Sequence, residues 1–231
     1  LYYGSRTGLS VVPDWTAESA SYQGALCRAT TVGDVNGDGY EDVLVGDRDY
    51  DYQYPTDDNG RAWLYFGGPS GLNTTADIIF NPPYTNTYGF FGRQVACAGD
   101  VDHDGYEDIL IGMDNYDNTG QDEGAVFVYY GSETGPSTTY SWMARGEATY
   151  AHFGLSAASA GDVNYDGYDD IIVGTLEDYL PEQPHVYVWY GGPGGLGDDG
   201  LPSNADWTAT NPNPGTSCFG AIVGGIDDVN G

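Results

Sequence analysis

The chain has 231 residues, of which 35 are Asp or Glu and only 6 are Lys or Arg, so its formal net charge at pH 7 is -29. A surface this acidic repels the phosphates of nucleic acids and of anionic membranes, and we expect no nucleic-acid partner and no membrane insertion. No run of about 18 apolar residues occurs, which also argues against a membrane span. The acidic excess favours a salty, calcium-containing or otherwise extracellular setting.

The composition predicts an all-β protein. With 36 Gly, 12 Pro and 21 Tyr, the chain is rich in turn formers and in residues that favour strands. No segment carries a helical periodicity long enough to predict a helix. We therefore expect many short strands that are joined by tight turns.

One ten-residue motif recurs along the chain. It occupies residues 33–42, 99–108 and 161–170, and a fourth copy begins at Asp228. The first Asp of each copy lies at position 34, 100, 162 or 228, so the period is about 65 residues. A fixed period of this size indicates an array of similar units.

Each unit contains four apolar segments in a constant order. In the second unit they are a Phe-Gly lead at 91–95, a β-branched run at 109–112, an aromatic segment at 126–131 and a weaker segment at 141–143. Four consecutive strands of this kind predict an antiparallel meander, and radially stacked meanders form the blades of a β-propeller. Uninterrupted apolar runs such as 109–112 are typical of strands that are buried on both faces.

The repeat divides the chain into one array that is incomplete or open at both ends. The predicted units are a partial blade at 1–19, blades at 20–83, 84–147 and 148–211, and a partial blade at 212–231. Residues 1–4 correspond to the end of an aromatic strand, and the last unit stops within its loop. We expect the sequence to be a piece of a longer protein.

The recurring motif has the chemistry of a calcium loop. Oxygen-bearing side chains occupy positions 1, 3, 5 and 9, and a glycine at position 6 allows a sharp turn. Position 12 is Val45, Ile111 or Val173, each within a strand-like run, whereas an EF-hand has a bidentate Glu there. Zinc would require Cys and His ligands. The alternative is that the motif binds no metal and that its Asp, Asn and Gly residues only form a tight turn.

These residues resemble the FG-GAP repeats of the integrin alpha-subunit β-propeller and its microbial relatives. The resemblance rests on Phe91-Gly92 and Phe153-Gly154, on the loop that follows each pair, and on the aromatic strand beyond it. In the first complete unit, Gln23-Gly24 replaces Phe-Gly. The resemblance implies a β-propeller with about three structural Ca²⁺ ions, one in each complete loop.

The resemblance also implies a ligand set for each loop, with the backbone carbonyl of the Tyr at position 7 completing the side chains. The implied ligands are Asp34, Asn36, Asp38, Tyr40 and Asp42; Asp100, Asp102, Asp104, Tyr106 and Asp108; and Asp162, Asn164, Asp166, Tyr168 and Asp170. In the last copy only Asp228 and Asn230 remain, which gives a partial site.

Three functions are compatible with this sequence. The first is an adhesion or recognition module with a protein or glycan partner at the cell surface, which would contact the loops at 47–54, at 114–123 and from 177 onward. The second is a structural subunit of a surface layer, stalk or filament that binds further copies of itself. The third is a catalytic or non-catalytic part of a glycan-active enzyme, but no GxSxG, HExxH or P-loop motif occurs, and we expect no catalysis.

Two further features lead to weaker predictions. Cys27, Cys97 and Cys218 occupy non-equivalent positions, which favours buried thiols over a disulfide. Asn73 begins the sequon Asn-Thr-Thr and is a candidate for N-glycosylation. In addition, Asp47, Asp49 and Asp51 are considered as ligands of a further cation.

Overall fold

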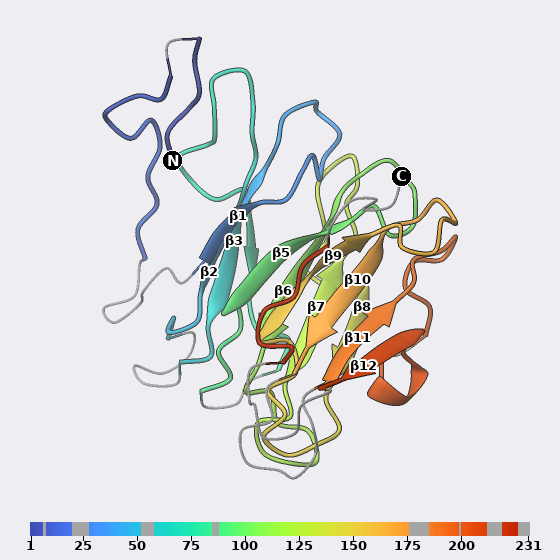
Figure 1. The fold of residues 1–231 in the computed structure, drawn as a ribbon. Helices are drawn as coiled ribbons and strands as arrows, with labels where there is room; N and C mark the ends of the chain where they lie inside the picture. The colour runs from blue at the N-terminus through green and yellow to red at the C-terminus, as the bar shows by residue number, and fades with distance from the viewer. Residues whose placement is uncertain are drawn as a thin grey trace.

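A computed structural model describes residues 1–6, 8–19, 28–51, 58–84, 88–175, 185–198, 200–211 and 219–225 of the chain (Figure 1). Three four-stranded antiparallel sheets make up this part of the chain. The predicted all-β architecture is thus confirmed, with a single 3-10 turn, η1 (Pro202–Asn204), as the only helical element among the described residues. No helix in this part of the chain is long and apolar enough to span a membrane.

Each sheet is a simple meander, because its strands pair in the order in which they occur in the chain. The first sheet contains β1 (Arg28–Thr31), β2 (Val43–Asp47), β3 (Arg61–Tyr65) and β4 (Ile78–Phe80). The second contains β5 (Gln94–Gly99), β6 (Asp108–Met113), β7 (Ala125–Tyr129) and β8 (Trp142–Arg145). The third contains β9 (Ser156–Gly161), β10 (Asp170–Gly174), β11 (His185–Trp189) and β12 (Trp207–Thr210).

The middle sheet is covered on both faces. Ile109 and Ile111 on β6 belong to the apolar core that the first two sheets share, whereas Leu110 belongs to the core that the second and third sheets share. Successive side chains of a strand point to opposite faces, so an uninterrupted apolar run fills both cores. The three sheets lie side by side like blades, and the described residues do not close into a ring (Figure 1).

The Phe-Gly lead joins one sheet to the next. The strands begin at Gln94 and Ser156, later than the predicted leads at 91–95 and 153–157. Phe91 instead forms a parallel bridge with Gly60 of the preceding sheet, and its N–H donates to the Asn59 carbonyl at 2.9 Å. The buried Phe91 and Phe153 rings fill the space between neighbouring sheets. The Phe-Gly lead therefore contacts the preceding sheet, and the first strand of its own sheet begins after it.

Glycine in the second strand makes this approach possible. A Cβ added at Gly46 would lie 2.0 Å from the Gly92 carbonyl oxygen, and one at Gly112 would lie 2.5 Å from the Gly154 oxygen. The third sheet repeats the contact, since a Cβ at Gly174 would lie 1.9 Å from the Gly220 oxygen. The Gly at the end of each apolar run is therefore a contact point between sheets, where no side chain fits.

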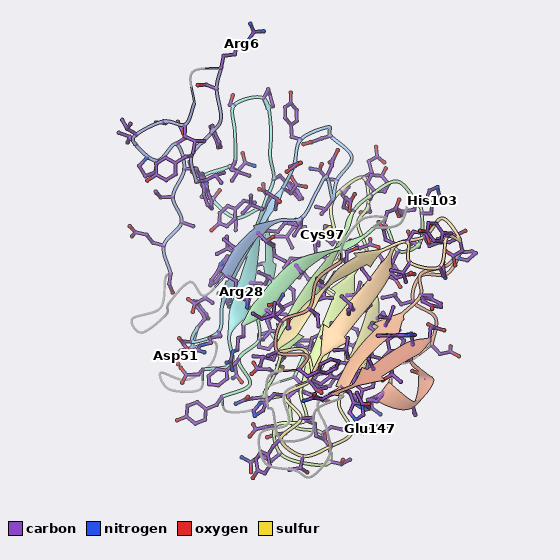
Figure 2. The ribbon with its side chains drawn as sticks, viewed as in Figure 1. Arg6, Arg28, Asp51, Cys97, His103 and Glu147 are labelled. Carbon is purple, nitrogen blue, oxygen red and sulfur yellow. The ribbon has the colours of Figure 1, made fainter. Side chains whose placement is uncertain are left out.

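The connections lie at two opposite ends of the molecule. The ten-residue loops follow the first strand of each sheet, and the connections of varied length follow the second strand. Figure 2 shows His103, in one of the ten-residue loops, and Glu147 at opposite ends of the fold. Residues 1–4 were predicted to be the end of an aromatic strand. In the described residues 1–6 and 8–19, the Leu1 amino group donates to the Trp15 carbonyl at 2.7 Å, but no regular strand forms.

Candidate metal centre

The three complete motifs form the turns between the first and second strands of their sheets. We call them loop 1 (33–42), loop 2 (99–108) and loop 3 (161–170). Position 9 is buried in all three loops, positions 1 and 3 are half-buried, and position 5 is exposed. The side chains at positions 1, 3 and 9 thus turn toward the interior of the loop end.

The first Asp of each loop holds the turn through backbone N–H groups. In loop 2, Asp100 Oδ1 accepts from Asp104 N at 3.0 Å and Asp100 Oδ2 accepts from Gly105 N at 3.0 Å. Loops 1 and 3 repeat both bonds through Asp34 and Asp162. The Asp at position 1 therefore has the same position and orientation in every loop.

The Asp at position 9 joins two connections of the same sheet. Asp108 Oδ2 accepts from Val101 N at 3.0 Å, and Asp108 Oδ1 accepts from Gly131 N, just beyond β7, at 2.8 Å. Asp42 and Asp170 make the corresponding pairs of bonds. All three carboxylates are fully buried, so they are fixed before any ligand binds.

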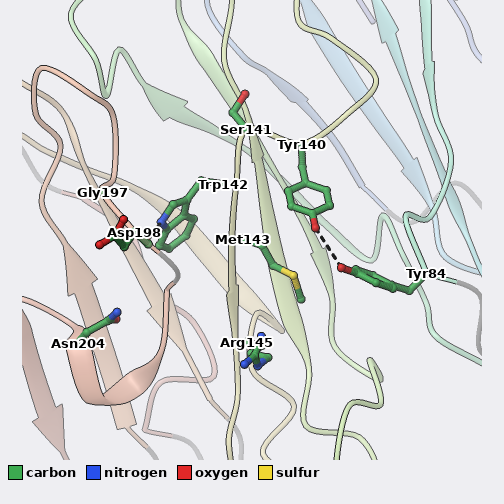
Figure 3. Close-up of a pocket in the computed structure, with 9 residues that line it drawn as sticks. All are labelled: Tyr84, Tyr140, Ser141, Trp142, Met143, Arg145, Gly197, Asp198 and Asn204. Atoms are coloured by element: carbon green, nitrogen blue, oxygen red, sulfur yellow. Dashed lines mark hydrogen bonds between the residues drawn. The ribbon is translucent and has the colours of Figure 1, made fainter.

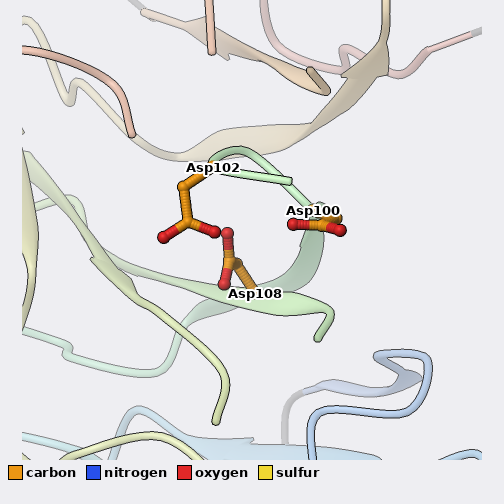
Figure 4. Close-up of side chains that lie close together, drawn as sticks. All are labelled: Asp100, Asp102 and Asp108. Carbon is orange, nitrogen blue, oxygen red and sulfur yellow. The ribbon is translucent and has the colours of Figure 1, made fainter. Parts of the chain in front are cut away.

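In loop 2, three carboxylates converge. Oxygen atoms of Asp100, Asp102 and Asp108 all lie within 4.8 Å of one another (Figure 4). Asp102 Oδ1 is buried and has no hydrogen-bond partner among the residues that the structure describes. A buried carboxylate oxygen without a partner is costly, and a hard cation would satisfy it.

Loops 1 and 3 differ because position 3 is Asn. Asn36 Nδ2 donates to Asp38 Oδ2 at 3.3 Å, and Asn164 Nδ2 donates to Asp166 Oδ2 at 2.9 Å. The amide thus links positions 3 and 5 within the loop, where loop 2 has two carboxylates. Among the described residues, loop 2 alone brings three acidic side chains this close.

The remaining predicted ligands occupy the outer part of each loop. Asp38, Asp104 and Asp166 at position 5 are exposed, and each accepts the N–H of the Tyr at position 7, which is Tyr40, Tyr106 or Tyr168. Asp104 therefore lies outside the close group of three. Asp228 and Asn230, the predicted partial site, lie outside the described residues.

Among the described residues, Asp47, Asp49 and Asp51, which were considered as ligands of an additional cation, do not converge on one site. Asp47 is buried and accepts from Ser19 Oγ and from Asp49 N, whereas Asp49 forms an ion pair with Arg48 at 3.1 Å. Asp51 Oδ1 accepts from Asp58 N. These carboxylates bind separate partners, so they do not form one ligand set.

The remaining sequence predictions have simple structural counterparts. Cys97 is a half-buried free thiol that donates to the Val32 carbonyl and to Glu107 Oε2. Cys27 and Cys218 lie outside the described residues. Asn73 is exposed, and its amide donates to Asp77 at 2.9 Å.

Burial perturbs the acidity of the loop carboxyls. Burial, together with the neighbouring charges of Asp102 and Asp100, raises the pKa of Asp108 to about 8, although two backbone hydrogen bonds act to lower it. The same causes raise the pKa of Asp42 and of Asp170 to about 6. A bound divalent cation would lower these pKa values, because it favours the ionised carboxylates. The donor set consists of oxygen atoms, which are the ligands that calcium prefers.

These pKa values predict how the metal-free protein responds to pH. A raised pKa means that the folded chain binds a proton more readily than the unfolded chain, so stability falls as the pH rises from 3.8 toward about 8. We expect metal-free protein to unfold at a lower urea concentration at pH 8 than at pH 5. Asp108→Asn should flatten this slope between pH 6 and 8, whereas a stability that rises across that interval would contradict the prediction.

The effect of Asp or Asn at position 3 of the loop can be tested by exchanging the two residue types. Asp102→Asn should stabilise the metal-free chain by about 0.5 kcal/mol, because it removes repulsion among partly exposed carboxylates. The same change should weaken calcium binding, because a charged ligand becomes neutral. The matched control is Asn164→Asp in loop 3, which should have the opposite effect on both quantities in thermal unfolding and calcium titration.

Position 8 of each loop was missed by the sequence analysis. Glu107 lies against Gly33 of loop 1, and Asp169 Oδ2 accepts from Asp100 N of loop 2 at 3.0 Å. Glu41 is the equivalent residue in loop 1. The sequence does show an acidic residue at position 8 of all three copies, but only the fold shows that this side chain contacts the preceding loop.

Comparison with known proteins agrees with this architecture. The FG-GAP repeat family matches residues 28–65 and 91–129, which contain β1 to β3 and the Phe-Gly lead through β7. The third sheet lies outside the matched residues but has the same strand order.

Several integrin alpha subunits are similar over most of this chain. Integrin alpha-5 of Xenopus laevis is 34% identical over 168 residues, which is 69% of this chain and 15% of that protein. Integrin alpha-8 of Homo sapiens is 33% identical over 74% of this chain and 16% of that protein, and integrin alpha pat-2 of Caenorhabditis briggsae is 30% identical over 88% and 17%. The chain thus spans only a small part of the length of these relatives. It is an FG-GAP repeat protein that resembles the integrin alpha subunits.

Proposed function

We propose that this chain is a calcium-stabilised extracellular FG-GAP module for adhesion or recognition, in which calcium has a structural role. The convergence of Asp100, Asp102 and Asp108 around a buried carboxylate oxygen without a partner is the observation that carries the proposal. The repeated hydrogen bonds extend the same chemistry to loops 1 and 3. Each loop would bind one Ca²⁺, giving about three in all.

Calcium would fasten the loop end of each sheet. In every loop the side chains at positions 1, 3, 5 and 9 and the carbonyl at position 7 would bind the ion. Because Asp108 also contacts the backbone beyond β7, an ion held by Asp108 would connect β5, β6 and β7. The ion supplies charge neutralisation and crosslinking, and no catalytic step requires it.

The opposite end of the molecule is the proposed contact surface. It carries the connections of varied length, including residues 114–124, and exposed aromatic side chains such as Tyr88, which is 50% exposed. The similarity to integrin alpha subunits supports a protein or glycan partner at a cell surface. We propose a binding role without catalysis.

Two measurements test this function together. Calorimetric titration of the metal-free chain should give about three calcium ions per chain, all lost when EGTA is added. The calcium-loaded chain should bind to intact cells from its source, and EGTA should abolish that binding. Failure to bind calcium would refute the structural role, whereas calcium binding without cell binding would refute adhesion.

A further inference from the structure

A cavity of about 580 Å³ lies on the outer side of the fold, between β8 and the segment that precedes β12 (Figure 3). Its lining includes Tyr84, Tyr140, Trp142, Arg145, Asp198 and Asn204. This volume lies within the range of small-ligand sites, which combine apolar walls with a few polar groups. Neither the ten-residue loops nor the connections proposed as the contact surface contribute these six residues.

Two tyrosines form a fixed aromatic wall of the cavity. The Tyr84 and Tyr140 hydroxyls are 3.0 Å apart and hydrogen-bond to each other (Figure 3). The Tyr84 ring is 5.3 Å from that of Tyr116, and the Tyr140 ring is 5.3 Å from that of Phe127. Tyr84 is nevertheless 41% exposed, so its ring is held in place and open to a ligand.

Arg145 supplies an uncompensated positive charge. Its half-buried guanidinium has no ion pair or hydrogen bond with any residue that the structure describes, whereas Arg93 donates to Asp114 and Arg48 to Asp49. Asp198 also lines the cavity, but no ion pair joins it to Arg145, so the guanidinium is available to a carboxylate from a ligand.

The opposite side of the cavity carries oriented polar groups. Asn204 Oδ1 accepts from Trp189 Nε1 at 3.2 Å and from Leu201 N at 2.8 Å, which fixes the amide. The Asp198 carbonyl accepts from Trp142 Nε1 at 2.7 Å, and the Asp198 side chain is exposed at the rim. These groups provide both donors and acceptors for hydroxyl groups.

We propose that this cavity binds a saccharide residue that carries a carboxylate, with the sugar ring on Tyr84 and the carboxylate on Arg145. Asp198 and Asn204 would then hydrogen-bond the sugar hydroxyls. The aromatic wall suits the apolar face of a pyranose, and the unpaired guanidinium selects the acidic sugar over the neutral one. The inference rests on the proposed recognition function, because it names the ligand class.

Paired sugars provide the test. Methyl β-D-glucuronide and methyl β-D-glucoside differ in a carboxylate and are titrated separately into the calcium-loaded chain, with the Trp142 indole N–H resonance as the NMR readout. The glucuronide should bind with a Kd on the order of 1 mM, as is usual for a small sugar. Arg145→Gln should weaken it by at least about tenfold, the scale of a lost charge-assisted hydrogen bond.

The chain offers a matched control in Arg28→Gln, an exposed arginine on β1 of the first sheet, which should leave glucuronide binding unchanged. Equal affinity for the two sugars, or no effect of Arg145→Gln, would overturn the proposal. Binding of an acidic peptide at this site in place of the glucuronide would also overturn it. Cell binding that persists in the Arg145→Gln chain would refute this ligand while leaving the recognition function intact.

A different observation concerns neighbouring loops, which share a peptide group. The Glu107 N–H donates to the Asp34 carbonyl at 3.2 Å, and the Asp169 N–H donates to the Asp100 carbonyl at 3.2 Å. The carbonyl of each of these peptide groups belongs to Tyr106 or Tyr168, the proposed ligand at position 7. If the carbonyl at position 7 binds an ion as proposed, one peptide plane would connect that ion with the backbone of the preceding loop.

Side chains reinforce the contact between loops. A Cβ added at Gly37 would lie 2.6 Å from the Tyr106 ring, and the His103 and Tyr168 rings lie 5.8 Å apart in a T-shaped arrangement. In each case position 7 of one loop rests on position 4 of the loop before it. Tyr40, which has no such neighbour among the described residues, is 42% exposed.

We infer that calcium ions bind to adjacent loops with positive cooperativity. A cation on the Tyr106 carbonyl would polarise the peptide and strengthen the hydrogen bond from Glu107 N–H to Asp34, which would order loop 1. This inference rests on the proposed calcium sites. It predicts coupling between loops 1 and 2 and between loops 2 and 3, and little coupling between loops 1 and 3.

Two double variants compare adjacent with separated loops. Asp162→Asn with Asp166→Asn disables loop 3 and leaves loops 1 and 2, whereas Asp100→Asn with Asp104→Asn leaves loops 1 and 3. Calcium titration by calorimetry should give a Hill coefficient above 1 for the first chain and close to 1 for the second. Equal coefficients would overturn the coupling, and an unmodified chain that binds no calcium would overturn the calcium proposal with it.

Discussion

Removal of calcium is expected to lower the melting temperature of this protein by about 8–16 °C. At tenfold saturation each bound ion adds roughly 1.4 kcal/mol to the free energy of unfolding, so three ions add roughly 4 kcal/mol. Each kcal/mol corresponds to about 2–4 °C in a chain of this size. Calcium has this effect because it binds the folded loops and not the unfolded chain. Differential scanning calorimetry with calcium and with EGTA measures it.

Two aspartates distinguish this mechanism from general charge repulsion. Asp104 and Asp117 are both exposed, but only Asp104 belongs to one of the proposed calcium loops. Asp104→Ala should lower the melting temperature of the calcium-loaded chain by several degrees more than Asp117→Ala, and EGTA should remove most of that difference. Equal effects of the two substitutions would contradict the assignment of the loop.

Gly46→Ala is expected to destabilise the fold by about 3 kcal/mol or more, toward the upper end of the cost of overpacking. The added methyl group would lie 2.0 Å from the Gly92 carbonyl oxygen, a backbone atom that cannot rotate away. The first and second sheets would have to separate, which opens the core that contains Leu44 and Phe127. Urea unfolding of the calcium-loaded protein measures the loss.

Gly194→Ala is the matched control for this prediction. A Cβ at Gly194 would meet no atom within 4 Å, and the residue does not have a positive φ. The control substitution should change the free energy of unfolding by less than about 0.5 kcal/mol. A similar loss for both variants would show that sheet contact is not the reason for glycine at position 46.

The sequence was sufficient to predict a four-stranded meander for each unit and the ten-residue loop between its first and second strands. Both are local properties: Ile109, Leu110 and Ile111 alternate between two cores, and Asp100 accepts from N–H groups only a few residues away. Strand ends were harder to place. The aromatic segment of the second unit was predicted to extend to Gly131, but β7 ends at Tyr129, where Tyr130 N donates to the Ser141 side chain and leaves the ladder.

Contacts between units could not be predicted from the sequence. Alignment of the repeats compares Phe91 with Phe153, but it does not show that Phe91 bonds to Asn59 of the preceding sheet. The same holds for Glu107, which binds the Asp34 carbonyl of the preceding loop, and for the cavity between Tyr84 and Asn204. These pairs depend on how the sheets stack, which a motif within one unit does not encode.

The separation of the two kinds of connection at opposite ends of the fold has a consequence for evolution and engineering. Insertions within 114–124 change the far end of the second sheet without altering the hydrogen bonds of loop 2. New specificities can therefore arise by lengthening or rewriting one rim, while the proposed calcium loops at the other rim would keep the blades in register. If these loops bind calcium as proposed, a foreign peptide grafted into residues 117–121 would be displayed on a scaffold whose rigidity depends separately on the calcium concentration.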